Sequence, residues 1–329
     1  MSASATSLTP PLGPRAESAL LTEAATLSEV LAHLSVEARQ VAAQVALGIH
    51  GRRRAGPGEE FWEFRPFRDG ESTTRIDWRR SARDDRLYVR EREWESASTH
   101  WLHLDLSPSM RFRSRVAQAA KLHRGAVLTL ALADVLVHAG ERVGLAGATP
   151  PLASRAIILR LAEALVRQEK QGQEKQGQEK EATTAPFPEP RLMRPRDHLV
   201  ILSDFIAPLE ALEAGIASIA HRGLKATLVL IRDPAEETFP FSGEVEFESL
   251  ESNARWRVGE AREMAQRYKA RILAHGEGLR SLALRQGFGF IRHITDQPPA
   301  TALLALAARL AGHNLAAQTL AGQDGRGAP

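Results

Sequence analysis

The sequence predicts an α/β fold in which a doubly wound, mainly parallel sheet carries helices on both faces. Short apolar segments typical of buried strands alternate with amphipathic segments of helical length, and this alternation indicates βαβ units. Hydrophobic residues make up 43% of the 329 residues, so the chain is long and apolar enough to bury a large core. We therefore expect a Rossmann-type arrangement, in which ligands bind at the carboxyl ends of the strands.

The expected strands and helices follow one another along this alternation. Strands are predicted by short apolar or alternating segments at 86–94, 99–106, 141–148, 197–205, 225–233 and 288–294. Helices are predicted by spaced apolar residues at 23–50, 116–138, 153–168, 207–222, 260–286 and 299–312. Residues 234–258 predict a β-hairpin that decorates the sheet and lies outside its parallel order.

Changes in composition divide the chain into regions. Residues 1–22 are rich in Ser, Pro and Ala and are expected to be a disordered tail, and residues 313–329 are expected to be a loose C-terminal tail. Residues 23–98 hold the N-terminal helix and a segment rich in Arg and aromatic residues, which we expect to pack on the sheet formed within 99–312. Inside that domain, 169–196 begins with repeats of EKQGQ and predicts a solvated linker.

Composition excludes several classes of function. The chain has no Cys, which excludes disulfides, thiolate metal sites and a thiol nucleophile. The net charge of +3 is close to balance, so little uncompensated positive charge is available for nucleic-acid binding. No stretch approaches the roughly 18 apolar residues of a membrane span, and the N-terminus lacks the apolar run of a signal peptide. We therefore expect a cytoplasmic protein with no membrane span and no nucleic-acid partner.

A candidate metal site lies at the carboxyl ends of two predicted strands. Asp105 comes directly after the first strand of the sheet, and Ser107 and Ser109 follow it, so one turn of chain brings three side-chain oxygens together. Asp204 ends another strand and reaches the same edge. Oxygen ligands of this kind suit Mg²⁺ or Mn²⁺.

This D-x-S-x-S pattern resembles the metal-ion-dependent adhesion site of von Willebrand factor A-type domains. The resemblance covers residues 99–312 and implies a divalent ion whose open coordination position accepts an acidic residue of a partner. The ligands that it implies are Asp105, Ser107, Ser109 and Asp204. The family also uses a Thr from a later loop, for which the weaker candidates are Thr149, Thr183 and Thr184.

Other interpretations of the same residues stay open. Ser107 or Ser109 alone could be a helix N-cap, because a hydroxyl satisfies free backbone amides at the start of a helix. The four residues could also serve a metal-dependent phosphoesterase, or the fold could be structural with an empty site. A serine hydrolase is disfavoured because no Gly adjoins Ser107 to allow the tight turn of its nucleophile. The chain has no GxxxxGK motif, which disfavours ATP hydrolysis, and no HExxH motif, which disfavours a zinc peptidase.

The segment from 51 to 94 carries the most specific motifs of the chain. It contains GEEFWEFRPFRDG, RIDWRRSAR and LYVREREW. These motifs resemble the bacterial family called domain of unknown function fifty-eight, in which such a block precedes a von Willebrand A-like domain. Members of that family lie beside MoxR-type AAA+ ATPases, so the resemblance implies such an ATPase as partner and a client protein that the two assemble or activate.

The residues of this segment allow two roles. Its 12 Arg stand against 10 Asp and Glu, so charge pairing is expected rather than phosphate binding. Because Arg pairs with carboxylates and stacks on aromatic rings, the segment is expected to form a structural charge network, a partner-docking surface, or both. The residues concerned are Glu59, Glu60, Phe61, Trp62, Arg65, Arg75, Asp77, Trp78, Arg83, Arg90 and Glu91. We expect a non-catalytic protein-interaction module.

Overall fold

The fold is known from a computed structural model. The structure describes residues 33, 35–44, 63–67, 73, 76–83, 86–91, 97–176, 186–189, 192–251 and 254–324. The chain forms two compact units, one of Met1–Val45 together with Ser98–Pro329 and one of Ala46–Ala97. The tail expected at 1–22 lies outside the described residues.

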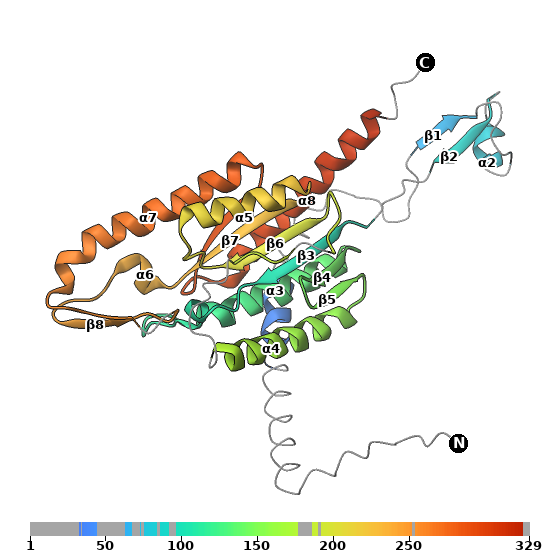
Figure 1. Ribbon diagram of the computed structural model, residues 1–329. Helices are drawn as coiled ribbons and strands as arrows, with labels where there is room; N and C mark the ends of the chain where they lie inside the picture. Colours follow the sequence, from blue (N-terminus) through green and yellow to red (C-terminus); the bar gives the residue numbers. More distant parts are fainter. Residues whose placement is uncertain are drawn as a thin grey trace, which may run out of the picture. The chain divides into compact units, whose positions relative to one another are not determined.

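The larger unit is built on a six-stranded, mostly parallel sheet, as the alternation of strands and helices predicts (Figure 1). Five neighbouring strands run parallel, and the last strand pairs antiparallel with its neighbour. From one edge to the other the strands are β10 (Gly289–Ile294), β7 (Lys225–Arg232), β6 (His198–Ser203), β3 (Thr99–Leu104), β4 (Arg142–Leu145) and β5 (Thr149–Leu152).

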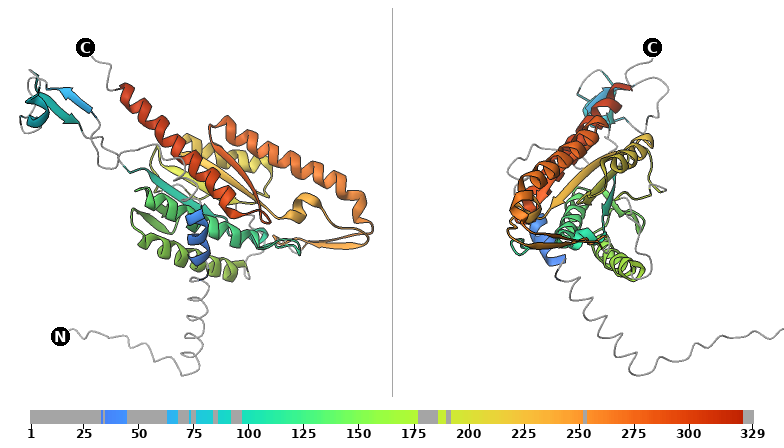
Figure 2. Two further views of the ribbon diagram at one scale, coloured as in Figure 1. Left: turned by 180° about the vertical axis from the view of Figure 1, so that it is seen from behind. Right: turned by 60° about the vertical axis from the view of Figure 1, so that its left-hand side comes forward.

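Helices cover both faces of this sheet, which confirms the predicted layering (Figure 2). Alternate residues of β3 show why: Leu102 and Leu104 belong to one apolar core, while Trp101 belongs to the other. The first core also takes side chains from α3 (Lys121–His138), α4 (Ala156–Gln176), α8 (Pro299–Asp324) and the N-terminal helix 35–44. The second core takes them from α5 (Leu209–His221) and α7 (Ala261–Arg285).

Two helices run further than the sequence predicts. Helix α4 continues to Gln176, so the segment expected to be a linker from 169 begins as a helix. Gln, Glu and Lys are good helix formers, so the repeat extends the preceding helix. Helix α8 continues to Asp324, so most of the C-terminal segment 313–329 that was expected to be a loose tail is helical. Its Ala and Leu residues have the same high helix propensity.

Strand β5 and the short helix α6 (Pro234–Thr238) are absent from the sequence prediction. The sequence of β5 is TPPL, and Pro argues against a strand because it has no amide to donate. An edge strand tolerates Pro, because its outward amides need no partner. The predicted hairpin forms between β8 (Val245–Glu248) and β9 (Arg255–Val258), as a separate antiparallel pair.

The smaller unit contains a second antiparallel pair, β1 (Glu63–Pro66) and β2 (Tyr88–Glu91). The second of these lies inside the strand predicted at 86–94. Between the two strands, α2 (Trp78–Ser81) is capped by Asp77, whose carboxylate accepts a hydrogen bond from the Arg80 amide at 3.0 Å. Helix α2 is tied to β2 by the Tyr88 amide, which donates to the Ser81 hydroxyl at 2.9 Å.

Candidate functional site at the carboxyl edge of the sheet

Asp105 lies where the sequence predicts it, directly after β3. Its backbone amide donates to the Leu202 carbonyl at 2.9 Å, which continues the β3–β6 pairing by one residue. One carboxylate oxygen accepts the Ser203 hydroxyl at 2.6 Å, and the other accepts the Ser107 amide at 2.9 Å. Burial raises the pKa of Asp105, and these hydrogen bonds oppose the rise. Both oxygens of this predicted ligand are therefore already engaged by the protein.

Ser107 and Ser109 lie beside each other in the loop that follows. Their hydroxyl oxygens are 3.2 Å apart, at the start of a 3-10 turn, η2 (Pro108–Arg111). Ser107 occupies the N-cap position of this turn, but its side chain makes no capping hydrogen bond. The Ser109 amide donates to the Glu251 carboxylate at 2.8 Å. Glu251 comes from the turn of the β8–β9 hairpin, so the loop already holds a carboxylate supplied by a distant part of the chain.

Asp204 follows β6 and is paired with a buried lysine. The Lys121 ammonium group, at the first residue of α3, lies 2.7 Å from an Asp204 oxygen and 2.6 Å from a Glu236 oxygen. Lys121 has an exposed fraction of 0%, so its charge is balanced only by groups inside the protein. Immediately after Asp204, Phe205 has a φ of 49°, the left-handed region that non-glycine residues rarely adopt, which marks a sharp turn at this edge.

A network of backbone contacts holds the remaining acids of this edge. Asp233 caps α6 through the Ala235 amide at 2.8 Å, and its second oxygen accepts the Ser114 amide at 2.8 Å. Glu236 accepts the Asp233 amide at 2.8 Å with the oxygen that does not contact Lys121. The end of β7, the start of α3 and the end of β6 are thus joined through charged side chains.

The predicted metal ligands do not form one open donor set. Asp105, Ser107 and Ser109 lie together, but Asp204 is committed to the Lys121 ammonium. Within the described residues, no group of three or more His, Asp or Glu side chains is placed to hold a metal ion. A divalent ion bound by Asp204 would share this carboxylate with the buried Lys121 ammonium, which contacts one of its two oxygens. The predicted donors are therefore already engaged by groups of the protein itself, and Mg²⁺ or Mn²⁺ at these four residues stays a prediction.

None of the three Thr candidates completes the set. Thr149 begins β5, which is separated from β3 by β4. Thr183 and Thr184 lie outside the described residues. Lys121, Glu236 and Glu251 belong to the candidate site, and the sequence prediction missed them. A Lys that precedes the long apolar run 125–133 is a signal for Lys121, whereas the positions of the two Glu depend on tertiary structure.

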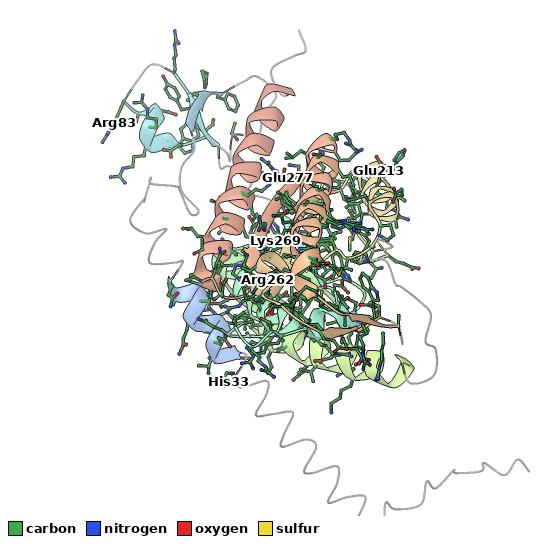
Figure 3. All side chains as sticks on the ribbon, turned by 90° about the vertical axis from the view of Figure 1, so that its left-hand side faces the viewer. His33, Arg83, Glu213, Arg262, Lys269 and Glu277 are labelled. Carbon is green, nitrogen blue, oxygen red and sulfur yellow. The ribbon has the colours of Figure 1, made fainter. Side chains whose placement is uncertain are left out.

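The Arg and aromatic segment is described only in part. Asp77 is an N-cap, and Trp78 and Arg83 are exposed, Trp78 by 61%. Figure 3 labels Arg83 among the side chains of this unit. For Arg65, Arg90 and Glu91 the structure places the backbone in β1 or β2. Glu59, Glu60, Phe61, Trp62 and Arg75 lie outside the described residues.

The sequence matches the family described as Protein of unknown function DUF58 over residues 63–278. This chain belongs to the DUF58 family. The match begins at β1 and ends inside α7, so it spans both compact units. Related sequences include the uncharacterized protein Mb1516 of Mycobacterium bovis and the uncharacterized protein Rv1480 of Mycobacterium tuberculosis, each 26% identical over 242 residues, which are 69% of this chain and 71% of the relative.

Two solved structures resemble this DUF58 chain weakly. BatB from Bacteroides thetaiotaomicron, a conserved hypothetical protein, has a TM-score of 0.32 and 13% identity, and covers 66% of this chain and 100% of its own. An aerotolerance-related membrane protein from Bacteroides fragilis has a TM-score of 0.32 and 14% identity, and covers 64% of this chain and 98% of its own. TM-scores this low support no inference about fold or function.

The cytoplasmic location expected from the sequence is corrected. Structural neighbours of this chain are described as an aerotolerance-related membrane protein and, from Vibrio fischeri, a membrane spanning protein, so the cytoplasmic assignment is not retained. Those descriptions belong to the neighbours, and they place this chain in no compartment. Among the residues that the structure describes, no helix has both the length and the apolar character needed to cross a membrane.

Proposed function

We propose that this DUF58 protein is a non-catalytic protein-interaction module with a von Willebrand A-like sheet. In this proposal, the loop from Asp105 to Ser109 recognises an acidic side chain of a partner. The observation that carries the proposal is the Ser109 amide, which already binds the carboxylate of Glu251 at 2.8 Å. A hydrogen bond from an amide to a carboxylate is charge-assisted and is stronger than one between neutral groups.

The hairpin acts in this proposal as an internal substitute for the partner. It is a two-stranded pair, which has limited stability by itself, and Leu250 at its turn is 49% exposed. A partner carboxylate that takes the Ser109 amide would release Glu251 to solvent. The loop is held ready for this exchange because Asp105 fixes the Ser107 amide and is itself fixed by Ser203.

Recognition in this proposal needs no divalent ion. The Lys121 ammonium supplies a fixed positive charge at Asp204, and the acids around it are joined to backbone amides. A metal-dependent phosphoesterase at the same residues is the alternative. It would place a metal ion beside the Lys121 ammonium at Asp204, and it would be supported by saturable Mn²⁺ binding and phosphoester turnover that are both lost in Asp105→Ala.

A MoxR-type AAA+ ATPase is the partner we propose on the basis of the family resemblance, with a client protein that the pair assembles or activates. Trp78 and Arg83 are exposed residues of the smaller unit, and Trp and Arg are the residue types that contribute most at interface hot spots. We propose that they contact this partner. Trp78→Ala should weaken capture of a purified MoxR-type ATPase from the same organism, whereas unchanged capture would exclude this surface.

The acidic-ligand proposal is tested with a fluorescent tetraglutamate peptide and a tetraglutamine control peptide. We expect Glu251→Ala to bind the tetraglutamate peptide about tenfold more tightly than wild type, because the internal competitor is removed. Glu248→Ala is the matched control, since Glu248 lies in the same hairpin but pairs with Arg255 at 3.2 Å. Equal affinity of wild type and Glu251→Ala, or equal binding of both peptides, would contradict the proposal.

A further inference from the structure

Arg232, the last residue of β7, is a buried cation with no hydrogen-bond partner for its terminal nitrogens. Its side chain is 1% exposed and is among the largest fully buried side chains of the described residues. Neither Nη1 nor Nη2 has a hydrogen-bond partner within the part of the chain that the structure describes. Buried guanidinium groups normally pair with a carboxylate, because an uncompensated charge inside a protein is costly. Arg232 therefore needs an acceptor from outside the described residues.

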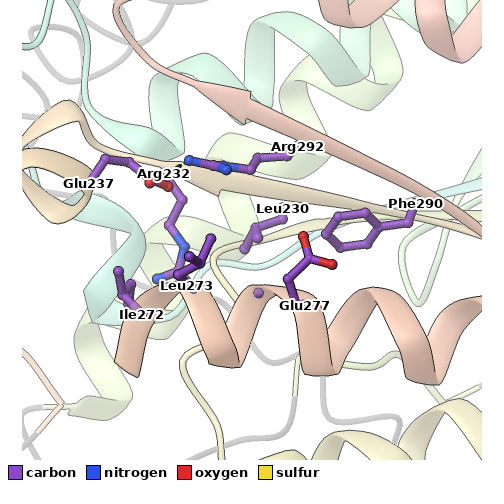
Figure 4. Close-up of a pocket in the computed structure, with 9 residues that line it drawn as sticks. Leu230, Arg232, Glu237, Ile272, Leu273, Glu277, Phe290 and Arg292 are labelled. Carbon is purple, nitrogen blue, oxygen red and sulfur yellow. Dashed lines mark hydrogen bonds and ion pairs between the residues drawn. The ribbon is translucent and has the colours of Figure 1, made fainter. Parts of the chain in front are cut away.

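A small pocket adjoins this side chain. It lies between β7, β10 and α7, and its walls include Leu230, Arg232, Leu273, Gly276, Phe290 and Arg292. In Figure 4 the Arg232 side chain extends from β7 toward α7 and lies beside Leu273. Leu273 is 57% exposed, whereas the terminal nitrogens of Arg232 are buried, so a ligand in the pocket would reach them only if a neighbouring side chain such as Leu273 moved.

The other charges around the pocket have partners. Arg292 forms an ion pair with Glu237, and Glu277 accepts a hydrogen bond from Arg280 at 3.3 Å. Of the acids that follow Arg232 in the chain, Asp233 is engaged by backbone amides and Glu236 by Lys121 and a backbone amide. Among these charged groups, Arg232 is the one whose terminal nitrogens make no hydrogen bond within the part of the chain that the structure describes.

Tyr268 is a nearby residue that carries no negative charge. It belongs to α7, and its ring lies tilted against that of Phe239, with ring centroids 4.7 Å apart. Burial and the nearby acid Glu236 raise the pKa of Tyr268 to about 12, so its hydroxyl is neutral at physiological pH. A neutral phenol can accept a hydrogen bond but does not balance a guanidinium charge.

We propose that this pocket binds a single carboxylate group through the Arg232 guanidinium. The planar guanidinium presents two parallel N–H groups that fit the two oxygens of one carboxylate, and no group of the described residues accepts from its terminal nitrogens. The apolar walls formed by Leu230 and Phe290 suit the hydrocarbon part of the acid. This site goes beyond the proposed function, because it uses neither the Ser109 amide nor Glu251.

Gly276 gives a means to narrow the pocket without removing its charge. A Cβ at this position would lie 3.8 Å from Leu230 Cδ2, which is ordinary van der Waals contact, so Ala is tolerated there. Because Gly276 lies within α7, Gly276→Ala should also improve helix propensity. A weaker ligand response in this variant would therefore not result from unfolding.

The experiment measures melting temperature against sodium acetate, with sodium chloride at equal ionic strength as the reference salt. In wild type we expect a saturable rise with acetate that chloride does not produce. Arg232→Met should lose this rise while remaining folded, because Met fills the same space without a charge. Gly276→Ala should need about tenfold more acetate for half of the effect, as expected for a methyl group that crowds the ligand. Arg285→Gln, which breaks an exposed pair with Glu213 and touches no residue of the pocket, is the matched control and should respond like wild type.

Each result decides the proposal. No acetate-specific rise in wild type would mean that water alone satisfies Arg232, and an undiminished rise in Arg232→Met would place acetate elsewhere; either result overturns the site. If the tetraglutamate peptide displaces acetate, the carboxylate comes from a partner side chain, and if it does not, the ligand is a small free carboxylate. Glu251→Ala should leave the acetate response unchanged, so failure of this site and failure of the Ser109 site are separate outcomes.

Discussion

Lys121 is the residue on which the candidate site depends most. It is fully buried and contacts two carboxylates, those of Asp204 and Glu236. Replacing all members of a buried cluster of ion pairs often changes the free energy of unfolding little. Removing only one member leaves an uncompensated charge in a low-dielectric interior. Lys121 is therefore important for stability because its removal would leave the buried carboxylates of Asp204 and Glu236 without their cation.

We predict that Lys121→Met lowers the free energy of unfolding by about 3–5 kcal/mol, because two buried carboxylates lose their cation. Denaturant unfolding at neutral pH measures the change. Adding Asp204→Asn and Glu236→Gln to Lys121→Met should recover part of the loss, since no unpaired charge remains. Arg280→Gln, which breaks an exposed pair with Glu277, should change stability by less than about 0.5 kcal/mol. Equal effects of Lys121→Met and Arg280→Gln would contradict the prediction.

At this scale the sequence predicts positions better than it predicts partners. Asp105, Ser107 and Ser109 are placed together because their spacing is local and follows a strand end. Asp204 is correctly placed at the end of β6, but its partner is a lysine from α3 that is 83 positions away in the chain. Glu251 reaches Ser109 across 142 positions. Contacts of such long range are set by how the elements pack, which residue spacing does not encode.

The elements themselves were largely predictable, since each parallel strand carries apolar residues for two cores. The exceptions have physical reasons. The Pro residues of β5 obscure an edge strand, and the repeat in 169–176 has the composition of a linker but the propensity of a helix. The close approach of α3 to the sheet at Gly125 could not be predicted, because a Gly within a helical pattern more often indicates a position of low helix stability.

Gly125 and Gly172 form a matched pair that tests this close approach. A Cβ at Gly125 in α3 would lie 2.5 Å from Leu104 Cδ1 and 3.3 Å from Ile231 Cδ1, whereas a Cβ at Gly172 in α4 would meet nothing within 4 Å. We predict that Gly125→Ala destabilises the protein by about 1–3 kcal/mol through overpacking, and that Gly172→Ala stabilises it by up to about 1 kcal/mol through helix propensity. Thermal and denaturant unfolding of both variants would show the opposite signs, and a stabilising Gly125→Ala would refute the packing.

For the larger unit as a whole, buried histidines set the dependence of stability on pH. Burial lowers the pKa values of His100, His103 and His293 to about 4, from 6.5 in an unfolded chain. The unfolded state therefore binds more protons than the folded state between these two values. Stability is fully present above pH 6.5 and is lost as the pH falls toward 4.

Within this window, each such histidine should lower the free energy of unfolding by about 1.4 kcal/mol for every pH unit that the pH falls. The three together should lower it by about 4 kcal/mol per pH unit. Asp105 acts in the opposite direction, because burial raises its pKa and the folded state gains a proton as the pH falls. Denaturant unfolding at pH 7, 6 and 5 measures the net slope. Replacing His103 by Gln should reduce the slope by about one histidine's share, since its imidazole is the group removed. A stability that does not change between pH 7 and 5 would show that these histidines are hydrated in the folded protein.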